Sequence, residues 1–328
     1  MKIMVIGSRS FVARTLIPAL KAARFDTVDF ARPDVSITYR KNLHWAIDIA
    51  TPELIINCAA QTNTAEIEKG LMACGEAYGT NYHGVALLAE ICHARNIALM
   101  HFSTDYVFSG EKGKAPYHEE DATFPANQYG RSKLFGEKSI RSTLERHVIL
   151  RTAWLYGMDG RNFLAWLVLN ASAGAPLVIP DNQWGSPTWV VRLADTVVKL
   201  CARMETMGDS FPWGTYHAAG QGTATWYMLA KALLLDPRWP EHMWEAGKNM
   251  RPSFSHDPWR PIDSTLDCTK LGTTFGIVYP PWRREVTACL ASLGSFSPIP
   301  PADAATESNA PSPLSAQSHH TALPAPTK

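Results

Sequence analysis

Short apolar runs alternate with longer amphipathic stretches through the first half of the chain. Residues 3–6, 27–30, 54–58, 99–102 and 148–151 have the length and the aliphatic content of buried strands. Residues 10–23, 84–95 and 132–145 carry apolar positions at helical spacing. Strands that alternate with helices in this way predict an α/β fold, a Rossmann-like doubly wound parallel sheet with helices on both faces.

Proline and tryptophan break the second half into shorter elements. Residues 190–204 and 226–235 keep a helical pattern, and Thr225 is the expected N-cap of the second helix. We predict one domain over residues 1–152, with elements around 177–205 returning to it. Residues 153–294 would form mainly a smaller, mixed lobe. Residues 295–328 are rich in Pro, Ala, Ser and Thr, which predicts a disordered tail.

Composition narrows the class of protein. The 328 residues are 46% hydrophobic and 19% charged, and the formal net charge is +1, which argues against a nucleic-acid surface. Six scattered cysteines form no metal-binding or disulfide pattern and favour a reducing compartment. No apolar run reaches membrane-spanning length, so we expect a cytoplasmic protein with no membrane partner.

A glycine-containing turn, residues 7–13, follows the first predicted strand and opens the first helix. Free N–H groups at a helix N-terminus bind phosphate. Gly7 holds the first position of the dinucleotide-binding glycine pattern, but Ser10 occupies the middle position and Ala13 the last. The Ser10 side chain would either bind the pyrophosphate or crowd it. We place the dinucleotide on Gly7, Arg9, Ser10, Phe11 and Val12.

Charged residues near this turn bear on the choice of dinucleotide. An acidic residue after the second strand selects a free ribose 2′-hydroxyl, whereas arginine accommodates a 2′-phosphate. Arg9 and Arg32 favour a cofactor with a 2′-phosphate, whereas Asp29 and Asp34 make this preference less distinct. Taken alone, each arginine is explained equally well as a solvated surface residue. We expect NADPH, with NADH left open, and add Arg32, Asp34 and Val35 to the cofactor contacts.

Tyr129 and Lys133 put a phenol and an ammonium four residues apart, on one face of a helix. Reduction of a carbonyl needs a proton donor, but the ordinary tyrosine pKa, near 10, is too high for efficient exchange. A neighbouring ammonium lowers that pKa. Thr104, at a predicted strand end, can donate to the same oxygen. Such a pair alone is often an exposed helix pair, but together with Thr104 it indicates a hydride-transfer enzyme.

Longer motifs surround these residues. They are Asn-Cys-Ala-Ala-Gln-Thr at 57–62, Ser-Thr-Asp-Tyr-Val-Phe at 103–108, the Tyr-x-x-x-Lys pair and Arg-Thr-Ala-Trp-Leu-Tyr at 151–156. Later segments follow at 162–163, 181–188, 216–217 and 260–271. In this order the motifs resemble the extended short-chain dehydrogenase/reductase family, and within it the dTDP-4-dehydrorhamnose reductases, over residues 1 to about 294.

The resemblance implies NADPH-dependent reduction of the 4-keto group of a 6-deoxy nucleotide sugar, with hydride delivered to C4. The implied catalytic residues are Thr104, Tyr129 (the proton donor) and Lys133. The implied cofactor contacts beyond the turn are Ala59, Ala60, Thr62, Tyr129 and Lys133. The implied sugar contacts are Asp105, Tyr106 and Trp154. A packed core aromatic is the alternative for Trp154.

Two loops depart from the family pattern. Residues 63–68 read Asn-Thr-Ala-Glu-Ile-Glu, where only Glu68 matches clearly, and Ser109 replaces the usual aspartate before Gly110. These loops border cofactor and sugar, so the identity of the sugar stays open. The glycine-poor turn favours an alternative, a non-catalytic NADP-binding regulatory subunit. A nucleotide-sugar epimerase or dehydratase with tightly held NAD is the third reading, and a homodimer is left open.

Overall fold

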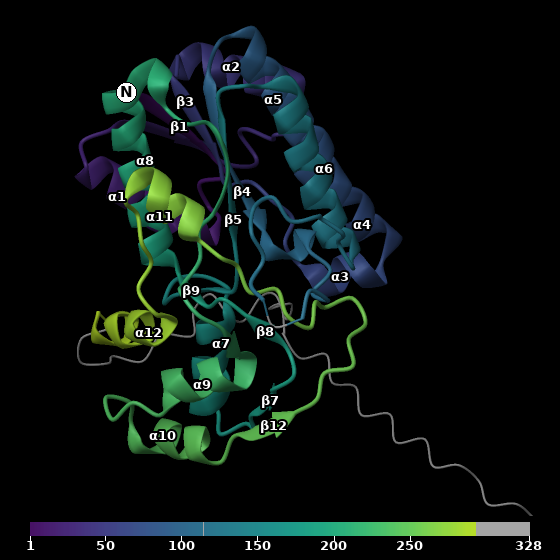
Figure 1. The fold of residues 1–328 in the computed structure, drawn as a ribbon, viewed down its shortest axis with the longest axis vertical. Coiled ribbons are helices and arrows are strands. Elements are labelled where there is room, and N and C mark those ends of the chain that lie inside the picture. The colour runs from purple at the N-terminus through teal and green to yellow at the C-terminus, as the bar shows by residue number, and fades with distance from the viewer. Residues whose placement is uncertain (114, 293–328) are drawn as a thin grey trace, which may run out of the picture.

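Six parallel strands form the central sheet, in the order β10-β5-β4-β3-β1-β2 (Figure 1). The computed structural model describes residues 1–113 and 115–292, so the expected tail lies outside the described residues. The strands are β1 (Lys2–Ile6), β2 (Asp26–Phe30), β3 (Leu54–Asn57), β4 (Ala98–Thr104), β5 (His147–Thr152) and β10 (Gly214–His217). The parallel sheet confirms the predicted fold class, and only β10 was not predicted as a strand.

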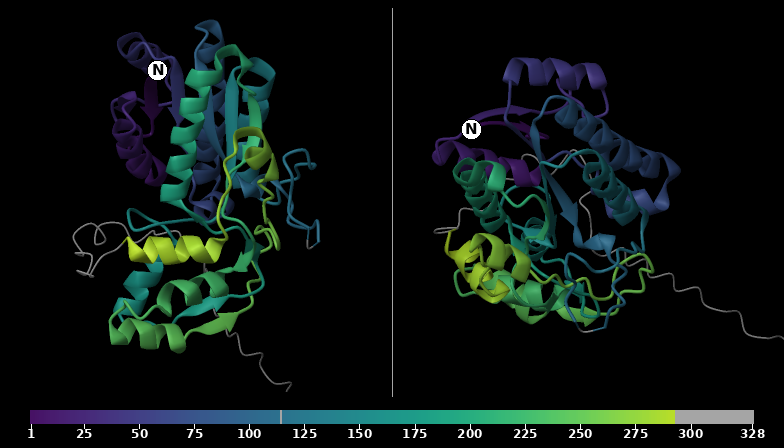
Figure 2. Two further views of the ribbon diagram at one scale, coloured as in Figure 1. Left: turned by 60° about the vertical axis from the view of Figure 1, so that its left-hand side comes forward. Right: turned by 45° about the horizontal axis from the view of Figure 1, so that its top comes forward.

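Helices cover both faces of this sheet (Figures 1 and 2). On one face lie α1 (Phe11–Ala22), α8 (Val190–Met207) and α11 (Thr269–Phe275). On the other lie α2 (Arg40–Ala50), α5 (Gly84–Ala94) and α6 (Gln128–Thr143). Aliphatic side chains make up most of both interfaces, and each fully buried one contributes about 1.5–3 kcal/mol. A segment around residues 177–205 was expected to return to the sheet, and α8, which overlaps it, packs there. β10 and α11 join it.

Three further helical segments lie beside the start of α6. They are α3 (Thr64–Lys69), α4 (Leu71–Tyr78) and a π-helical turn (Gly79–His83) that runs on into α5. All three pack against α6. None of the helices within the described residues is both long and apolar enough to span a membrane.

The rest of the second half forms a smaller lobe at the carboxyl end of the sheet (Figure 1). Its helices are α7 (Phe163–Ser172), α9 (Trp226–Leu234), α10 (Glu241–Lys248) and α12 (Trp282–Ala291). Its strand pairs are β6 (Leu155–Tyr156) with β9 (Thr188–Trp189), β7 (Val178–Pro180) with β12 (Arg251–Ser253), and β8 (Trp184–Gly185) with β11 (Ala224–Thr225). Thr225 is the N-cap of α9, as predicted, because its Oγ1 accepts the Met228 N–H at 3.1 Å.

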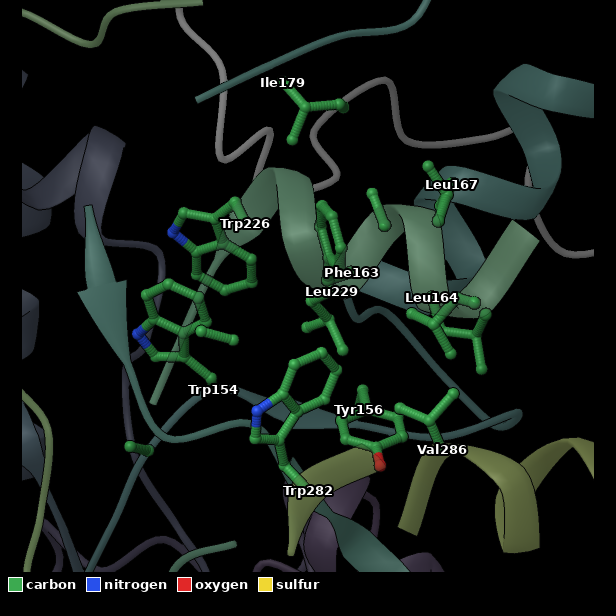
Figure 3. Packing of buried hydrophobic residues seen from close by; sticks show 14 of the residues in the cluster. Trp154, Tyr156, Phe163, Leu164, Leu167, Ile179, Trp226, Leu229, Trp282 and Val286 are labelled. Carbon is green, nitrogen blue, oxygen red and sulfur yellow. The ribbon is translucent and has the colours of Figure 1, made fainter. Parts of the chain in front are cut away.

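Aromatic rings hold the lobe together. The indoles of Trp154 and Trp226 stack with centroids 3.7 Å apart and planes 5° from parallel. Phe163 packs on Trp226 at 4.8 Å, and Tyr156, Leu229 and surrounding aliphatic side chains complete the cluster (Figure 3). This core gives the lobe a hydrophobic centre of its own, separate from the two cores of the sheet.

Candidate active site

The order of the sheet reverses at β1, whose neighbours are β2 and β3. Open α/β sheets bind ligands in the crevice at such a switch point, beyond the carboxyl ends of the strands. Gly7 follows β1 there with a φ of +83°, and a Cβ at this position would lie 2.6 Å from Ala59 N. Both facts require glycine, because another residue would be strained and would collide with the neighbouring backbone.

The N-terminus of α1 faces this crevice from Ser10. The Ser10 Oγ accepts the Ala13 N–H at 3.3 Å, so its side chain caps the helix. The N–H groups of Phe11 and Val12 have no partner within the helix, and the helix dipole favours an anion beside them. The turn therefore fits a dinucleotide pyrophosphate even though its middle glycine is replaced.

The charges predicted to select the cofactor lie near the end of β2. The Gly7 N–H donates to Phe30 O at 2.8 Å, which sets the turn against this strand end. Asp29 lies 3.8 Å from Lys21 and is drawn toward α1. Arg32 is exposed just beyond β2 and borders a surface concavity before α2. Of the other residues predicted here, Arg9 and Asp34 are exposed, and Val35 is buried in the core beneath α2.

Helix α6 begins at Gln128, four residues before its predicted start, because two side chains cap it. The Asn127 Oδ1 accepts the Gly130 N–H at 2.6 Å. The Glu68 Oε1, from α3, accepts the N–H groups of Gln128 and Tyr129 at 2.7 and 3.2 Å. These bonds set the first turn of the helix, and with it the backbone of Tyr129. Glu68 is thus a positioning residue that sequence reasoning noted only as a family match.

Replacing Glu68 by alanine is expected to cost about 1 kcal/mol of stability, since two helical N–H groups lose their acceptor. Because the freed turn carries Tyr129, any catalytic activity should fall as well. Urea denaturation and turnover of Glu68→Ala, compared with Glu76→Ala on the exposed face of α4, measure both effects. Equal behaviour of the two variants would show that the cap does not position Tyr129.

The side chain of Thr104 lies beside the phenol of Tyr129. Thr104 Oγ1 donates to Asp105 Oδ1 at 3.1 Å and accepts the Tyr106 N–H at 3.2 Å. Thr104 favours the phenolate form of Tyr129, but burial has the larger and opposite effect. Burial raises the pKa of Tyr129 above its ordinary value, so the phenol holds its proton at neutral pH.

The lobe reaches this site through the segment before α11. The Ser264 hydroxyl donates to Asp105 Oδ2 at 2.5 Å, and burial raises the pKa of Asp105 to about 6. The Asn127 Nδ2, from the cap of α6, donates to Trp259 O at 2.7 Å. Burial raises the pKa of Tyr106, and the nearby Arg260 guanidinium opposes this rise. Lobe and sheet thus share polar contacts around Tyr129.

Lys133 lies one turn further along α6 and is buried. Its Nζ donates to Phe102 O at 2.6 Å and lies 3.1 Å from His101 Nε2. Burial lowers the pKa of Lys133 to about 8, although the Glu137 carboxylate opposes this shift. Sequence reasoning missed His101, yet a polar residue inside the apolar run 98–102 was a usable signal.

A buried ion pair lies one further turn along α6. Arg151 donates to both carboxylate oxygens of Glu137, at 2.9 and 2.8 Å. Ser103 and Arg141 donate to the same carboxylate at 2.5 and 2.8 Å. These bonds, led by those from Arg151, outweigh burial and hold the pKa of Glu137 at about 2. The pair joins α6 to β5 beneath the proposed catalytic residues.

The other residues predicted to contact cofactor or sugar lie either after β3 or in the core of the lobe. Ala59 and Ala60 are partly exposed after β3, and Thr62 is exposed. Trp154 is buried in the lobe with a φ of +45° and stacks on Trp226 (Figure 3). The structure therefore groups Thr104, Asp105, Tyr106, Tyr129 and the nearby Lys133, while most of the Trp154 ring is covered by core neighbours.

Known proteins resemble this chain over nearly all its described length. Residues 1–295 match the model of the RmlD substrate binding domain. A dTDP-4-keto-6-deoxy-D-glucose reductase of Streptomyces niveus is 37% identical over 78% of this chain and 89% of its own length. A dTDP-4-dehydrorhamnose reductase of Sinorhizobium fredii is 34% identical over 89% of this chain and 98% of its own.

Solved structures agree with the sequence relatives. A dTDP-4-dehydrorhamnose reductase from Clostridium acetobutylicum is 28% identical, with a TM-score of 0.77, over 89% of this chain and 99% of its own. The Bacillus anthracis enzyme of the same name, in complex with NADP, is 25% identical with the same TM-score, over 89% of this chain and 100% of its own. The chain therefore belongs to the family of the RmlD substrate binding domain, which confirms the resemblance of its motifs to the dTDP-4-dehydrorhamnose reductases.

Proposed function

We propose that this chain reduces the 4-keto group of a 6-deoxy nucleotide sugar with NADPH. The observation that carries the proposal is the Tyr129 phenol beside Thr104, at the carboxyl end of β4. At the same end of the sheet, the turn after β1 has the glycine that a dinucleotide site needs. Relatives are named for reducing dTDP-linked keto sugars. The six cysteines are unpaired, which fits a cytoplasmic location.

The residues of the crevice would hold the cofactor in a defined way. The N–H groups of Phe11 and Val12 would bind the pyrophosphate, Gly7 would let it approach the backbone, and Arg32 would meet a ribose 2′-phosphate. Bound NADPH supplies the hydride. Ala59, Ala60 and Thr62 border the same crevice from the end of β3 and are proposed to line the cofactor.

Tyr129 would then act as the acid. A substrate carbonyl that enters beside Thr104 would accept a hydrogen bond from the Tyr129 phenol. As negative charge grows on the carbonyl oxygen, Tyr129 transfers its proton to it and becomes a phenolate. Thr104 stays next to the phenolate oxygen, and the Lys133 ammonium stabilises this charge. Asp105, Tyr106 and Trp154 are proposed to contact the sugar.

A screen of NADPH oxidation with a panel of keto nucleotide sugars tests this function. Turnover with a 4-keto-6-deoxy sugar nucleotide, and none with the matching hydroxyl sugar, is the expected result. NADPH binding without any turnover would instead favour a regulatory subunit. NAD that stays bound through purification would favour an epimerase or dehydratase.

Arg32→Ala is expected to raise KM for NADPH about tenfold or more and to leave KM for NADH unchanged. A hydrogen bond to a charged group contributes about 1.5–3 kcal/mol, and only NADPH carries the 2′-phosphate that Arg32 would bind. Steady-state kinetics with both cofactors measure the difference. Lys41→Ala, an exposed change on nearby α2, is the control. Equal loss for both cofactors would remove Arg32 from the selection of NADPH.

A further inference from the structure

His101 lies behind the proposed catalytic residues, in the middle of β4, and is fully buried. Its Nε2 is 3.1 Å from Lys133 Nζ, and its Nδ1 is 3.0 Å from Asn57 Nδ2. Asn57 ends β3, so the imidazole bridges the neighbouring strand and helix α6. Because both ring nitrogens have a polar partner, the partners decide which nitrogen carries the proton.

Asn57 determines the tautomer of this ring. Its Oδ1 accepts the Ala59 N–H at 3.0 Å, which leaves its NH₂ group facing His101 Nδ1. An amide NH₂ can only donate, so Nδ1 must accept. Burial holds the pKa of His101 well below its ordinary value, so the ring is neutral. A neutral imidazole whose Nδ1 accepts has its proton on Nε2.

The Nε2–H of His101 therefore points at Lys133. An ammonium has only donors and cannot accept this hydrogen, whereas an amine has a lone pair that can. Phe102 O, at 2.6 Å, accepts an N–H from either form. The surroundings thus give the amine an acceptor for one N–H and a donor for its lone pair, and they set an N–H dipole against the ammonium.

The other titratable groups around Lys133 either favour its ammonium form or are uncharged. Glu137, one turn along the helix, favours the ammonium, but its carboxylate is shared with Arg151 and a second guanidinium. Burial raises the pKa of Cys58, which follows β3, to about 12, so this thiol is neutral. Tyr129, one turn before, is also neutral.

We propose that His101 is a positioning residue: locked by Asn57 as the Nε2–H tautomer, it holds Lys133 in place and favours its amine form. The tautomer does not depend on the proposed function, whereas the kinetic consequence rests on it. The ammonium that stabilises the Tyr129 phenolate is lost as pH rises. Turnover therefore has an alkaline limb that Lys133 sets and His101 shifts.

Nuclear magnetic resonance of the full chain labelled with ¹⁵N-histidine tests the tautomer without substrate or cofactor. The signals of His101 are identified by their loss in His101→Gln. We expect a protonated Nε2 and an unprotonated Nδ1 at neutral pH. A proton on Nδ1, or on both nitrogens, would overturn the proposal.

The pH profile of kcat tests the effect on Lys133. In His101→Gln the side-chain carbonyl can turn to Nζ and accept from the ammonium, so the alkaline limb should move up by about one pH unit or more. His147→Gln, which changes a buried histidine at the start of β5, should leave it in place. An unmoved limb in His101→Gln would refute the proposal. Absence of turnover in wild-type protein would refute the proposed function instead, and the spectrum would still decide the tautomer.

Discussion

Replacing Tyr129 by phenylalanine is expected to lower kcat by about 10²–10⁴-fold and to leave NADPH binding and stability nearly unchanged. General acid catalysis by a positioned side chain contributes a factor of this size. Phenylalanine keeps the ring and its edge contact with Tyr106, whose centroid is 5.9 Å away, and removes only the hydroxyl. Turnover of a keto nucleotide sugar and NADPH fluorescence titration measure the two properties separately.

Tyr78→Phe is the matched control for this variant. The Tyr78 hydroxyl donates to the Oε1 of Gln128, the residue before Tyr129, at 2.9 Å. Tyr78→Phe therefore removes a phenol oxygen near the first turn of α6 and leaves Thr104 unchanged. We expect Tyr78→Phe to keep most of its activity. A Tyr129→Phe protein as active as Tyr78→Phe would rule out Tyr129 as the proton donor and would leave Thr104 or an ordered water as the remaining source.

Arg151→Met is expected to destabilise the protein by about 3–5 kcal/mol at pH 7. Removing one partner of a buried ion pair leaves the other charge without compensation. Glu137 is fully buried and would keep only Ser103 and Arg141 as donors. Urea denaturation measures the loss, and Arg203→Met, an exposed change on α8, should be nearly silent.

The pH dependence of this loss identifies its cause. The Glu137 pKa is about 2 in the folded protein against an ordinary value of 4.5, so its stabilising contribution is present above pH 4.5 and is lost as pH falls toward 2. In Arg151→Met the buried carboxyl binds a proton more readily. The deficit relative to wild type should therefore shrink between pH 7 and pH 4. A constant deficit would mean that lost packing, and not the unpaired charge, destabilises the variant.

The strands and the candidate catalytic residues could be predicted from the sequence because each depends on residues that are close together in the chain. Apolar runs of four or five residues predicted β1 to β5 to within three residues at each end. The residues Thr104, Tyr129 and Lys133 stood out by type and spacing. β10 was missed because its four residues, Gly-Thr-Tyr-His, carry no apolar run, and it becomes a strand only by pairing with β5.

Contacts between segments that are distant in the chain could not be predicted from local sequence. The start of α6 depends on Glu68, about sixty residues earlier in the chain, and the Asp105 carboxylate on Ser264, much later. The role of Ser10 was undecided until the structure showed its hydroxyl capping α1. Each of these outcomes depends on which side chain arrives next to a backbone or charged group after folding.

The sequence by itself determined the α/β class and pointed to the residues proposed for the dinucleotide turn and for the acid, because strand periodicity and side-chain chemistry are local properties. Only the tertiary structure decided the protonation of those residues. Burial raises the pKa of Tyr129 and lowers that of Lys133, and the bonds from Asn57 through His101 to Lys133 cross two strands and a helix. Desolvation and hydrogen-bond direction exist only once the chain has folded, and they govern how the proposed chemistry responds to pH.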